Sequence, residues 1–355
     1  MEKYVVIMAG GVGSRFWPRS RKKSPKQLLN IIGDYTMIQE TYYRVKNLVS
    51  PENVFIITNK VQKVLIEEQL PEIPAKNIIA EPVGKNTAPC IGLAAKIINN
   101  LNKDSVFVTL PADHIIKDEN KFLSTLNKAI EFAESSKGLL TFGITPARPE
   151  TGYGYINFNK DEIKENIHKV KKFVEKPDLS TAEMYLESGE YLWNSGMFIW
   201  RSDVILEEIQ KYLPAIYKHL ENIDEKIDED ELNQILASIY PQMDSVSIDY
   251  GIMEKSEKVY VMEGDFGWSD VGSWETVYEL NKKDNDENAL VGDTYVNDVK
   301  NSYIYSPEKF TAVIGVENLL VINTDDALLV CKREQAQEVK KIVDNLNREG
   351  RDSLT

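Results

Sequence analysis

Short apolar segments alternate with helical patterns over residues 1–145, and this alternation limits the folds open to the chain more than any other feature. The predicted strands are Tyr4–Met8, Val54–Thr58, Asn77–Ala80, Ser105–Leu110 and Leu139–Phe142. Strands separated by helices build a parallel sheet with helices on both faces. We therefore expect an α/β fold with a doubly wound, mostly parallel, Rossmann-like sheet. Ligands of such sheets bind beyond the carboxyl ends of the strands, so the residues that follow each strand are the first candidates for a site.

The pattern changes twice after this region. Strand and helix signals are mixed over about 150–265, which indicates an insertion in the same core. The insertion is predicted to contain strands at Tyr153–Phe158, Val170–Val174 and Met197–Trp200 and a polar helical stretch near Leu206–Tyr240. After Trp274 short strands follow one another closely, at Ser302–Tyr305, Thr311–Val316, Leu319–Asn323 and Ala327–Cys331. This spacing predicts a small C-terminal β-helix-like segment. We place the domain boundary near residue 285, between a domain over 1–285 and a segment over 286–355.

The chain is expected to end in one amphipathic helix. The helix is predicted from Arg333 to about Arg348, with one apolar stripe made of Ala336, Val339, Val343 and Leu346. Such a stripe docks on a core or on a partner. Together with the β segment it is compatible with a homodimer.

Composition excludes several classes of partner. The formal net charge of −14 argues against nucleic acid and anionic membranes, so any phosphate site must be a local basic pocket. The two cysteines, Cys90 and Cys331, lie far apart, which favours a reduced compartment over a disulfide framework. No apolar run approaches the roughly 20 residues that cross a bilayer, and Met1 leads directly into a strand. A cytoplasmic protein is expected.

A glycine-rich loop follows the first predicted strand directly. Its glycines are Gly10, Gly11 and Gly13, and they let the backbone turn sharply and present amide N–H groups to phosphate oxygens. The loop lacks the Gly-Lys-Ser/Thr of a Walker sequence, and Phe16 replaces the third glycine of a dinucleotide fingerprint. Arg15 and Lys26 supply the fixed positive charge that a triphosphate requires.

Two aspartates lie in loops far apart in the sequence. Asp113 follows a predicted strand in Leu-Pro-Ala-Asp-His, and Asp270 lies in the glycine-flanked segment Gly267–Trp274. Mg²⁺ needs only one or two carboxylates, because substrate phosphates and water complete its octahedron. Taken singly, either aspartate is equally typical of a turn or a helix cap. His114 is expected to shape the neighbourhood, and no second His or Cys stands at a spacing suited to zinc.

Eight ordered segments of the chain resemble those of the mannose-1-phosphate guanylyltransferases, within the sugar-nucleotide pyrophosphorylase family. They are the loop Gly10–Arg15 with Pro25–Gln27, then Glu81–Pro82 with Lys85–Pro89, Pro111–His114, Thr151–Ile156, Phe173–Pro177, Trp193–Phe198, Ser247–Tyr250 and Gly267–Asp270. The resemblance covers nearly the whole chain. It is closest to the short form without the isomerase domain, because the three histidines include none beyond His219 and an isomerase site needs a cluster of His and Glu ligands.

The resemblance implies a reaction and a place for each motif. GTP and mannose 1-phosphate would react with Mg²⁺ to give GDP-mannose and pyrophosphate. The triphosphate would be held by Gly10, Gly11, Gly13, Arg15 and Lys26, and the base would lie near Glu81, Asn86 and Thr87. The hexose would be lined by Gly154, Glu175, Asn194 and Gly196, and Lys176 would reach the sugar phosphate. The metal would be held by Asp113, which also touches the nucleotide, and by Asp270. The cations Arg15, Lys26 and Lys176 would carry the catalysis. Each of these segments singly has an ordinary structural explanation, such as a strand end before Pro177 or a hairpin at Thr151–Gly154.

Three other functions remain open on the sequence. A glycosyltransferase would normally present an Asp-x-Asp metal motif and has no use for Arg15 or for Pro25–Gln27. A non-catalytic homologue that senses nucleotide sugars would be expected to have lost Arg15, Lys26, Asp113 or Asp270, and all four are present. Within the enzyme class, another sugar 1-phosphate or nucleotide pair is the main alternative.

Overall fold

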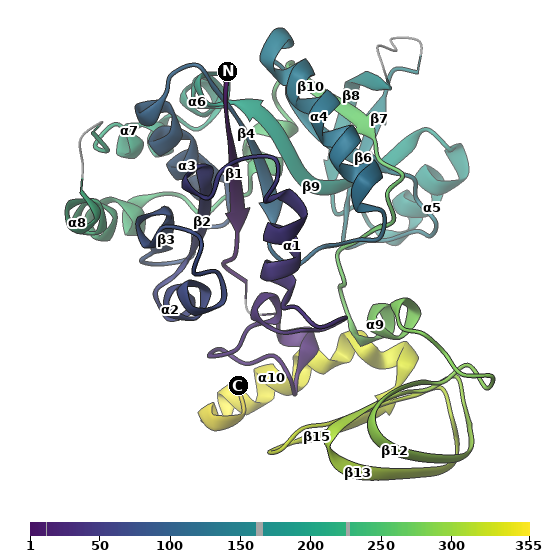
Figure 1. Ribbon diagram of the computed structural model, residues 1–355. Helices are drawn as coiled ribbons and strands as arrows, with labels where there is room; N and C mark the ends of the chain where they lie inside the picture. The colour runs from purple at the N-terminus through teal and green to yellow at the C-terminus, as the bar shows by residue number, and fades with distance from the viewer. Residues whose placement is uncertain (12, 161–165, 225–227) are drawn as a thin grey trace. The chain divides into compact units, whose positions relative to one another are not determined.

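The computed structural model describes residues 1–11, 13–160, 166–224 and 228–355. Val12 of the glycine loop and two short parts of the predicted insertion lie outside the described residues. The chain forms two compact units (Figure 1). The first comprises Met1–Gly10, Thr41–Ala112 and Ile116–Trp268, and the second comprises Gly11–Glu40, Asp113–Ile115 and Ser269–Thr355. The glycine loop is thus divided, since Gly10 belongs to the first unit and Gly11 to the second.

The first unit contains a nine-stranded sheet with the strand order β3-β2-β1-β4-β9-β6-β10-β8-β7. Its strands are β1 (Glu2–Met8), β2 (Val54–Asn59), β3 (Ile78–Glu81), β4 (Ser105–Pro111), β6 (Leu139–Ile144), β7 (Gly154–Phe158), β8 (Ile167–Glu175), β9 (Tyr191–Arg201) and β10 (Val259–Glu263). The strands β8 and β9 run against the other seven. The predicted mostly parallel α/β sheet is therefore confirmed. The antiparallel β9 is longer than the predicted strand Met197–Trp200.

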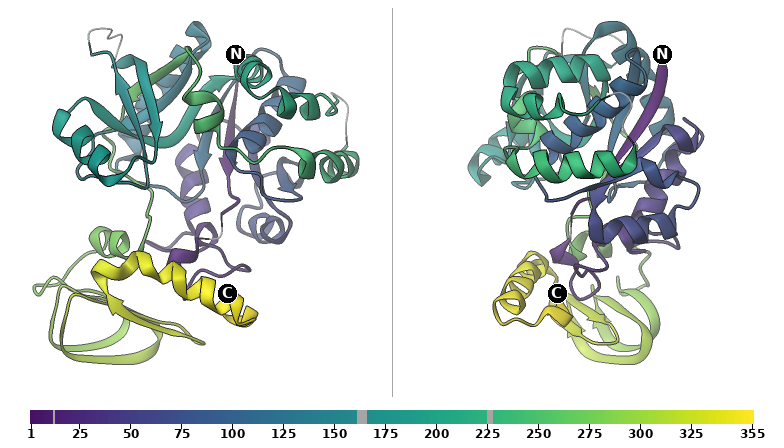
Figure 2. Two further views of the ribbon diagram at one scale, coloured as in Figure 1. Left: turned by 180° about the vertical axis from the view of Figure 1, so that it is seen from behind. Right: turned by 90° about the vertical axis from the view of Figure 1, so that its left-hand side faces the viewer.

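Helices cover both faces of this sheet (Figure 2). They are α1 (Met37–Val45), which continues into this unit, α2 (Lys60–Gln69), α3 (Thr87–Leu101), α4 (Glu119–Ser136), α5 (Leu179–Ser188), α6 (Ser202–Tyr212), α7 (Pro214–Leu220) and α8 (Glu229–Ile239). Val6 of β1 faces a core shared with α3, α6, α7 and α8. Its fully buried neighbours Val5 and Ile7 point to the other face, because side chains alternate along a strand. On that other face Phe122 of α4 packs edge to face with Phe142 of β6.

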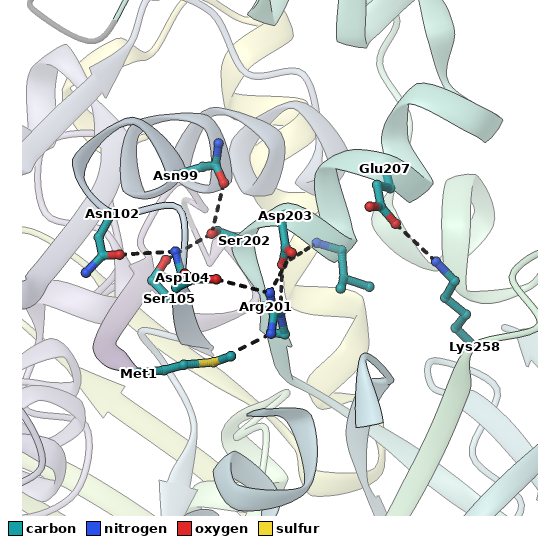
Figure 3. A network of polar contacts seen from close by, with 11 residues as sticks. Met1, Asn99, Asn102, Asp104, Ser105, Arg201, Ser202, Asp203, Glu207 and Lys258 are labelled. Carbon is teal, nitrogen blue, oxygen red and sulfur yellow. Dashed lines mark hydrogen bonds and ion pairs between the residues drawn. The ribbon is translucent and has the colours of Figure 1, made fainter. Parts of the chain in front are cut away.

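A polar network fixes the β4–β9 pair at the amino end of β4 (Figure 3). The guanidinium of Arg201 donates to both carboxylate oxygens of Asp203, at 2.9 and 2.7 Å, and lies 3.5 Å from Asp104. The hydroxyl groups of Ser105 and Ser202 are 2.9 Å apart. This buried pairing holds the end of the sheet opposite the carboxyl ends where ligands bind.

The second unit is built around a four-stranded sheet with the order β12-β13-β14-β15. Its strands are β12 (Ala289–Lys300), β13 (Tyr303–Glu317), β14 (Leu319–Asn323) and β15 (Leu328–Lys332). The first three run parallel and β15 is antiparallel, which agrees with the predicted β-helix-like segment. Two details of the prediction were wrong: Ser302–Tyr305 and Thr311–Val316 belong to one strand, and β12 was missed. Polar and apolar residues are mixed along β12 and its side chains are largely exposed, so no apolar run longer than Ala289–Val291 marks it.

The glycine loop and the C-terminal segment share one core within the second unit. Trp274 opens the short helix α9 (Trp274–Leu280) and is fully buried, and its indole N–H donates to the carbonyl of Trp17 at 3.0 Å. The indole N–H of Trp17 in turn donates to the carbonyl of Leu354 at 2.8 Å. The two-residue strands β5 (Ile115–Ile116) and β11 (Trp268–Ser269) complete the strands of the part of the chain that the structure describes.

The final helix differs from its prediction in where it begins. A 3₁₀ turn covers Arg333–Glu338, and only α10 (Val339–Arg348) is α-helical. Ala336, Val339 and Leu346 of the predicted stripe are buried in the core of the second unit, and Val343 is partly buried there. Within the described residues, no helix is both long and apolar enough to span a bilayer.

Candidate active site

The glycine loop turns at Gly13 into a 3₁₀ turn over Ser14–Phe16. Gly13 has a φ of 72°, and a Cβ atom at this position would lie 2.4 Å from Cβ of Lys26. Only glycine fits both the left-handed backbone and this close approach. The carbonyl of Gly11 accepts a hydrogen bond of 2.7 Å from the side-chain amide of Gln27, which ties the loop to the Pro-Lys-Gln element.

A cavity of about 260 Å³ lies beside this loop within the second unit. Its walls are formed by Gly13, Ser14, Arg15, Phe16, Lys26, Asp113, His114, Asp270, Val271, Gly272 and Lys340. Five of the predicted site residues thus lie around one space, namely Gly13, Arg15, Lys26, Asp113 and Asp270. The sequence analysis did not single out Lys340, which reaches the same cavity from α10.

Lys26 links the two aspartate loops. Its ammonium group donates to a carboxylate oxygen of Asp113 at 2.9 Å, to the carbonyl of Asp113 at 3.2 Å and to the carbonyl of Asp270 at 2.7 Å. An ammonium group has three N–H donors, so these contacts engage all of them. Lys26 is 4% exposed and therefore acts first as a buried link that holds the two aspartates in one place.

Asp113 is held in its ionised form. Burial alone would raise the pKa of its carboxyl group, but the charges of Lys26 and His114 and the hydrogen bond from Lys26 outweigh burial and lower the pKa. Asp270 is followed by Val271, which has a φ of 45°. A β-branched residue in this region is strained, and such strain is concentrated at functional loops.

The two carboxylates fit a hard divalent cation. No group of three or more His, Cys, Asp or Glu side chains suited to a metal occurs among the described residues. A site with two aspartates is nevertheless what Mg²⁺ requires when phosphate oxygens and water supply the remaining ligands. Gly272 leaves room for this arrangement, because a Cβ there would lie 3.1 Å from a carboxylate oxygen of Asp270.

Glu81, at the carboxyl end of β3, is buried and paired in the first unit. Its carboxylate accepts a short hydrogen bond from the hydroxyl of Tyr240, a side chain with no exposed surface. Burial raises the pKa of Glu81 to about 7, although the Tyr240 hydrogen bond opposes this shift. Gly10 lies next to this carboxylate, since a Cβ at Gly10 would be 3.7 Å from it. Glu81 is therefore poised between its charged and neutral forms at neutral pH.

Asn86 and Thr87 form the beginning of α3. Asn86 has a φ of 68°, and its side-chain oxygen accepts from the backbone N–H of Thr87 at 2.9 Å. The hydroxyl of Thr87 accepts from the backbone N–H of Ile248 at 2.8 Å. Both side chains thus have structural roles in this conformation, Asn86 as a helix cap and Thr87 as a tie to the segment that contains Ile248.

Gly154, Glu175 and Asn194 lie together in the first unit, on three adjoining strands. Gly154 of β7 pairs with Glu175 at the end of β8, and a Cβ at Gly154 would lie 2.5 Å from the Glu175 carboxylate. The absence of a side chain at Gly154 makes room for this carboxylate. Lys176, whose side chain is 57% exposed, forms an ion pair of 2.8 Å with Glu175.

Asn194 is oriented by three contacts. Its amide nitrogen donates to a carboxylate oxygen of Asp249 at 2.9 Å, and its carbonyl oxygen accepts from the hydroxyl of Thr141 at 3.0 Å and from the N–H of Gly196 at 3.2 Å. Gly196 has a φ of 70°. Asp249 begins a π-helical turn, Asp249–Met253, a feature that is frequent at functional sites. Burial, and then the charge of Glu175, raise the pKa of Asp249 to about 7.

Sequence reasoning missed the roles of Asp249, Tyr240 and Lys340. Asp249 stands in a segment that carried the family resemblance, but nothing in that segment showed which side chain it orients. Tyr240 and Glu81 are 159 residues apart in the chain, and Lys340 is one of two adjacent lysines on an amphipathic helix. None of the three carries a local signal that could have been found without the fold.

The glycine loop, the paired aspartates and the mostly parallel sheet define the class of enzyme. Residues 4–287 match the model of the family described as nucleotidyl transferase, and residues 293–346 match the MannoseP isomerase/GMP-like beta-helix domain. The fold and the sequence thus agree on a nucleotidyltransferase.

Similarity to individual proteins identifies the family within the nucleotidyltransferases. The chain is 44% identical over 351 residues to a mannose-1-phosphate guanylyltransferase of Salmonella muenchen, covering 98% of this chain and 74% of that protein. It is 40% identical over 354 residues to a mannose-1-phosphate guanylyltransferase of Escherichia coli, covering 98% and 76%. A solved structure from Thermus thermophilus, described as a mannose-1-phosphate geranyltransferase, matches with a TM-score of 0.88 and 31% identity over 98% of this chain and all of that one. The chain belongs to the mannose-1-phosphate guanylyltransferase family.

Proposed function

We propose that the protein transfers GMP from GTP to the phosphate of mannose 1-phosphate, giving GDP-mannose and pyrophosphate. One observation carries the proposal: Arg15, Lys26, Asp113 and Asp270 surround a single cavity beside the glycine loop. The names of the relatives support the choice of GTP and mannose 1-phosphate.

The reaction is proposed as a direct in-line displacement. An oxygen of the sugar phosphate forms a bond to the α-phosphorus of GTP, the bond from that phosphorus to the bridging oxygen breaks, and pyrophosphate leaves with the electron pair. The attacking phosphate is already ionised at neutral pH, so no enzyme nucleophile is required. The protein must align two anions and neutralise the charge that develops between them, and alignment alone contributes about 7–11 kcal/mol for well-oriented reactants.

Each predicted site residue of the cavity has a part in this scheme. Mg²⁺ held by Asp113 and Asp270 would supply positive charge to the reacting phosphates. The glycine backbone N–H groups and the Arg15 guanidinium bind phosphate oxygens. Lys26 keeps the two aspartates together, and it contacts phosphate by exchanging one of its present acceptors.

The remaining predicted residues are assigned to the sugar and the base. The carboxylate of Glu175 and the amide of Asn194 accept from and donate to hexose hydroxyl groups, with Gly154 and Gly196 leaving space, and Lys176 binds the sugar phosphate. Glu81, Asn86 and Thr87 bind the base, where an ionised Glu81 accepts from guanine N–H groups. Because the pKa of Glu81 is about 7, this acceptor gains charge as the pH rises through neutrality.

The test is pyrophosphate release with Mg²⁺ over a grid of nucleoside triphosphates and hexose 1-phosphates. Release confined to GTP with mannose 1-phosphate supports the proposal. A different preferred pair would keep the mechanism and overturn the specificity. If no pair on the grid releases pyrophosphate while calorimetry still detects nucleotide-sugar binding, a non-catalytic sensor would be favoured instead.

We further propose a domain boundary near residue 285, a homodimer and a cytoplasmic location. The domain boundary near residue 285 is tested by limited proteolysis, and a homodimer by light scattering coupled to size-exclusion chromatography. A cytoplasmic location fits the two free cysteines, Cys90 and Cys331, and is tested by cell fractionation.

A further inference from the structure

Lys340 brings a third cationic side chain to the cavity of the glycine loop. It is the second residue of α10 and follows Val339, which is 1% exposed and packed in the core of the second unit. The backbone of Lys340 is therefore anchored, while its side chain is exposed and lines the cavity together with Gly13 and Arg15.

The cavity needs this additional charge. A nucleoside triphosphate carries several negative charges at neutral pH, and Asp113 and Asp270 add two more beside it. Lys26 already donates to Asp113 and to the carbonyl of Asp270, so its charge is largely committed to holding them. Among the cationic side chains of the cavity, only Arg15 and Lys340 lack a side-chain hydrogen bond or ion pair with the described residues.

We propose that Lys340 binds the pyrophosphate portion of the nucleoside triphosphate and of the pyrophosphate product. This assignment rests on the proposed function. A lysine is a compact, mobile point charge, which suits the terminal phosphates that must be held during reaction and then released to solvent. The exposed position of Lys340 agrees with this end of the substrate, whereas the buried Lys26 lies against the aspartates that hold the metal. The C-terminal segment thereby contributes a substrate-binding residue and is more than a structural support.

The experiment compares Lys340→Met with Lys340→Arg and with Lys341→Met. Lys341 follows on the same helix, is 73% exposed, and pairs with Glu338 instead of lining the cavity. Two measurements are made on each full-length variant: the dissociation constant for pyrophosphate with Mg²⁺ by calorimetry, which needs no turnover, and the KM values for GTP and mannose 1-phosphate. Circular dichroism confirms that each variant is folded.

We expect Lys340→Met to weaken pyrophosphate binding and to raise the KM for GTP by about tenfold each, the effect of losing one charge-assisted contact. The KM for mannose 1-phosphate should stay unchanged, Lys340→Arg should restore most of the affinity, and Lys341→Met should behave like the wild type. Equal affinities for Lys340→Met and wild type would overturn the assignment, as would equal losses in the two methionine variants. If the wild type makes no GDP-mannose while Lys340→Met still loses pyrophosphate affinity, the proposed function fails and the phosphate site stands.

Discussion

Replacing Asp249 by Asn should stabilise the protein at alkaline pH and leave its stability nearly unchanged in acid. The pKa of Asp249 rises from its ordinary value of 3.8 to about 7, first because the carboxyl group is buried and then because Glu175 is nearby. The unfolded chain loses this proton at about pH 4, whereas the folded chain keeps it to about pH 7. Between these values the folded state binds the extra proton, so the free energy of unfolding falls as the pH rises.

The size of the effect follows from the shift. About three pKa units at 1.36 kcal/mol each correspond to about 4 kcal/mol of destabilisation once Asp249 is ionised. Partial solvent exposure of Asp249 and the loss of a charged acceptor for the Asn194 amide reduce the gain expected from the substitution. We therefore expect Asp249→Asn to be more stable than the wild type by about 2–3 kcal/mol at pH 8 and to match it at pH 4.

Urea unfolding of both proteins at pH 4, 6 and 8 measures this difference. Asp244→Asn is the matched control, because Asp244 lies on the same segment and is exposed. The expected result is a difference between Asp249→Asn and wild type that grows with pH, with none for the control. A difference that does not depend on pH, or a variant less stable than wild type at pH 8, would refute the reasoning about buried charge.

Three further substitutions test the candidate site. Asp270→Asn should lower kcat at least about 100-fold without unfolding the protein. Pyrophosphate release measures kcat and circular dichroism measures folding, with the exposed Asp265→Asn as control; turnover near wild type would exclude Asp270 from the metal site. Lys176→Met should raise the KM for mannose 1-phosphate about tenfold and leave the KM for GTP unchanged, with exposed Lys171→Met as control; an equal rise in both KM values would contradict a sugar-phosphate role. Tyr240→Phe removes the hydrogen bond that lowers the pKa of Glu81, so the midpoint of the pH dependence of the KM for GTP should move upward from about 7; an unmoved midpoint would separate Glu81 from base binding.

The strands β1, β2 and β4 of the first sheet were predictable because burial on both faces leaves a continuous apolar run, whereas β10 was not predicted. Val5, Val6 and Ile7 of β1 and the equivalent residues of β2 and β4 are all buried, and each run is readable without knowledge of its neighbours. The direction of β9 was not predictable in the same way. An apolar run has the same pattern in a parallel and an antiparallel strand, and β9 is antiparallel because it lies between β4 and β6 in the folded sheet.

The residues of the candidate site likewise divide into those that a local sequence pattern predicts and those that depend on the fold. Gly13 and Asp113 were predicted as site residues because each follows a strand, where a local rule about ligand binding applies. Asp249 and Tyr240 contact partners that only the fold brings near, as the separation of 159 residues between Tyr240 and Glu81 illustrates, and only the fold places Lys340 beside the cavity. Lys26 shows a third case. Its sequence position indicated a phosphate ligand, and the structure adds that its three donors hold Asp113 and Asp270, a role that depends on a contact across 244 residues.

The shared core of the second unit explains why a β-helix-like segment accompanies the glycine loop. A glycine loop is flexible by itself, and ordering it costs conformational entropy, so it must be held by its surroundings. Phe16 and Trp17, directly after the loop, are buried against Trp274 and Tyr303, and the carbonyl of Leu354 accepts from Trp17. The last residues of the chain therefore stabilise the conformation of residues near its beginning. A segment that already supports the loop in this way can supply a cation to the same cavity from an ordered backbone, which is the position that Lys340 occupies.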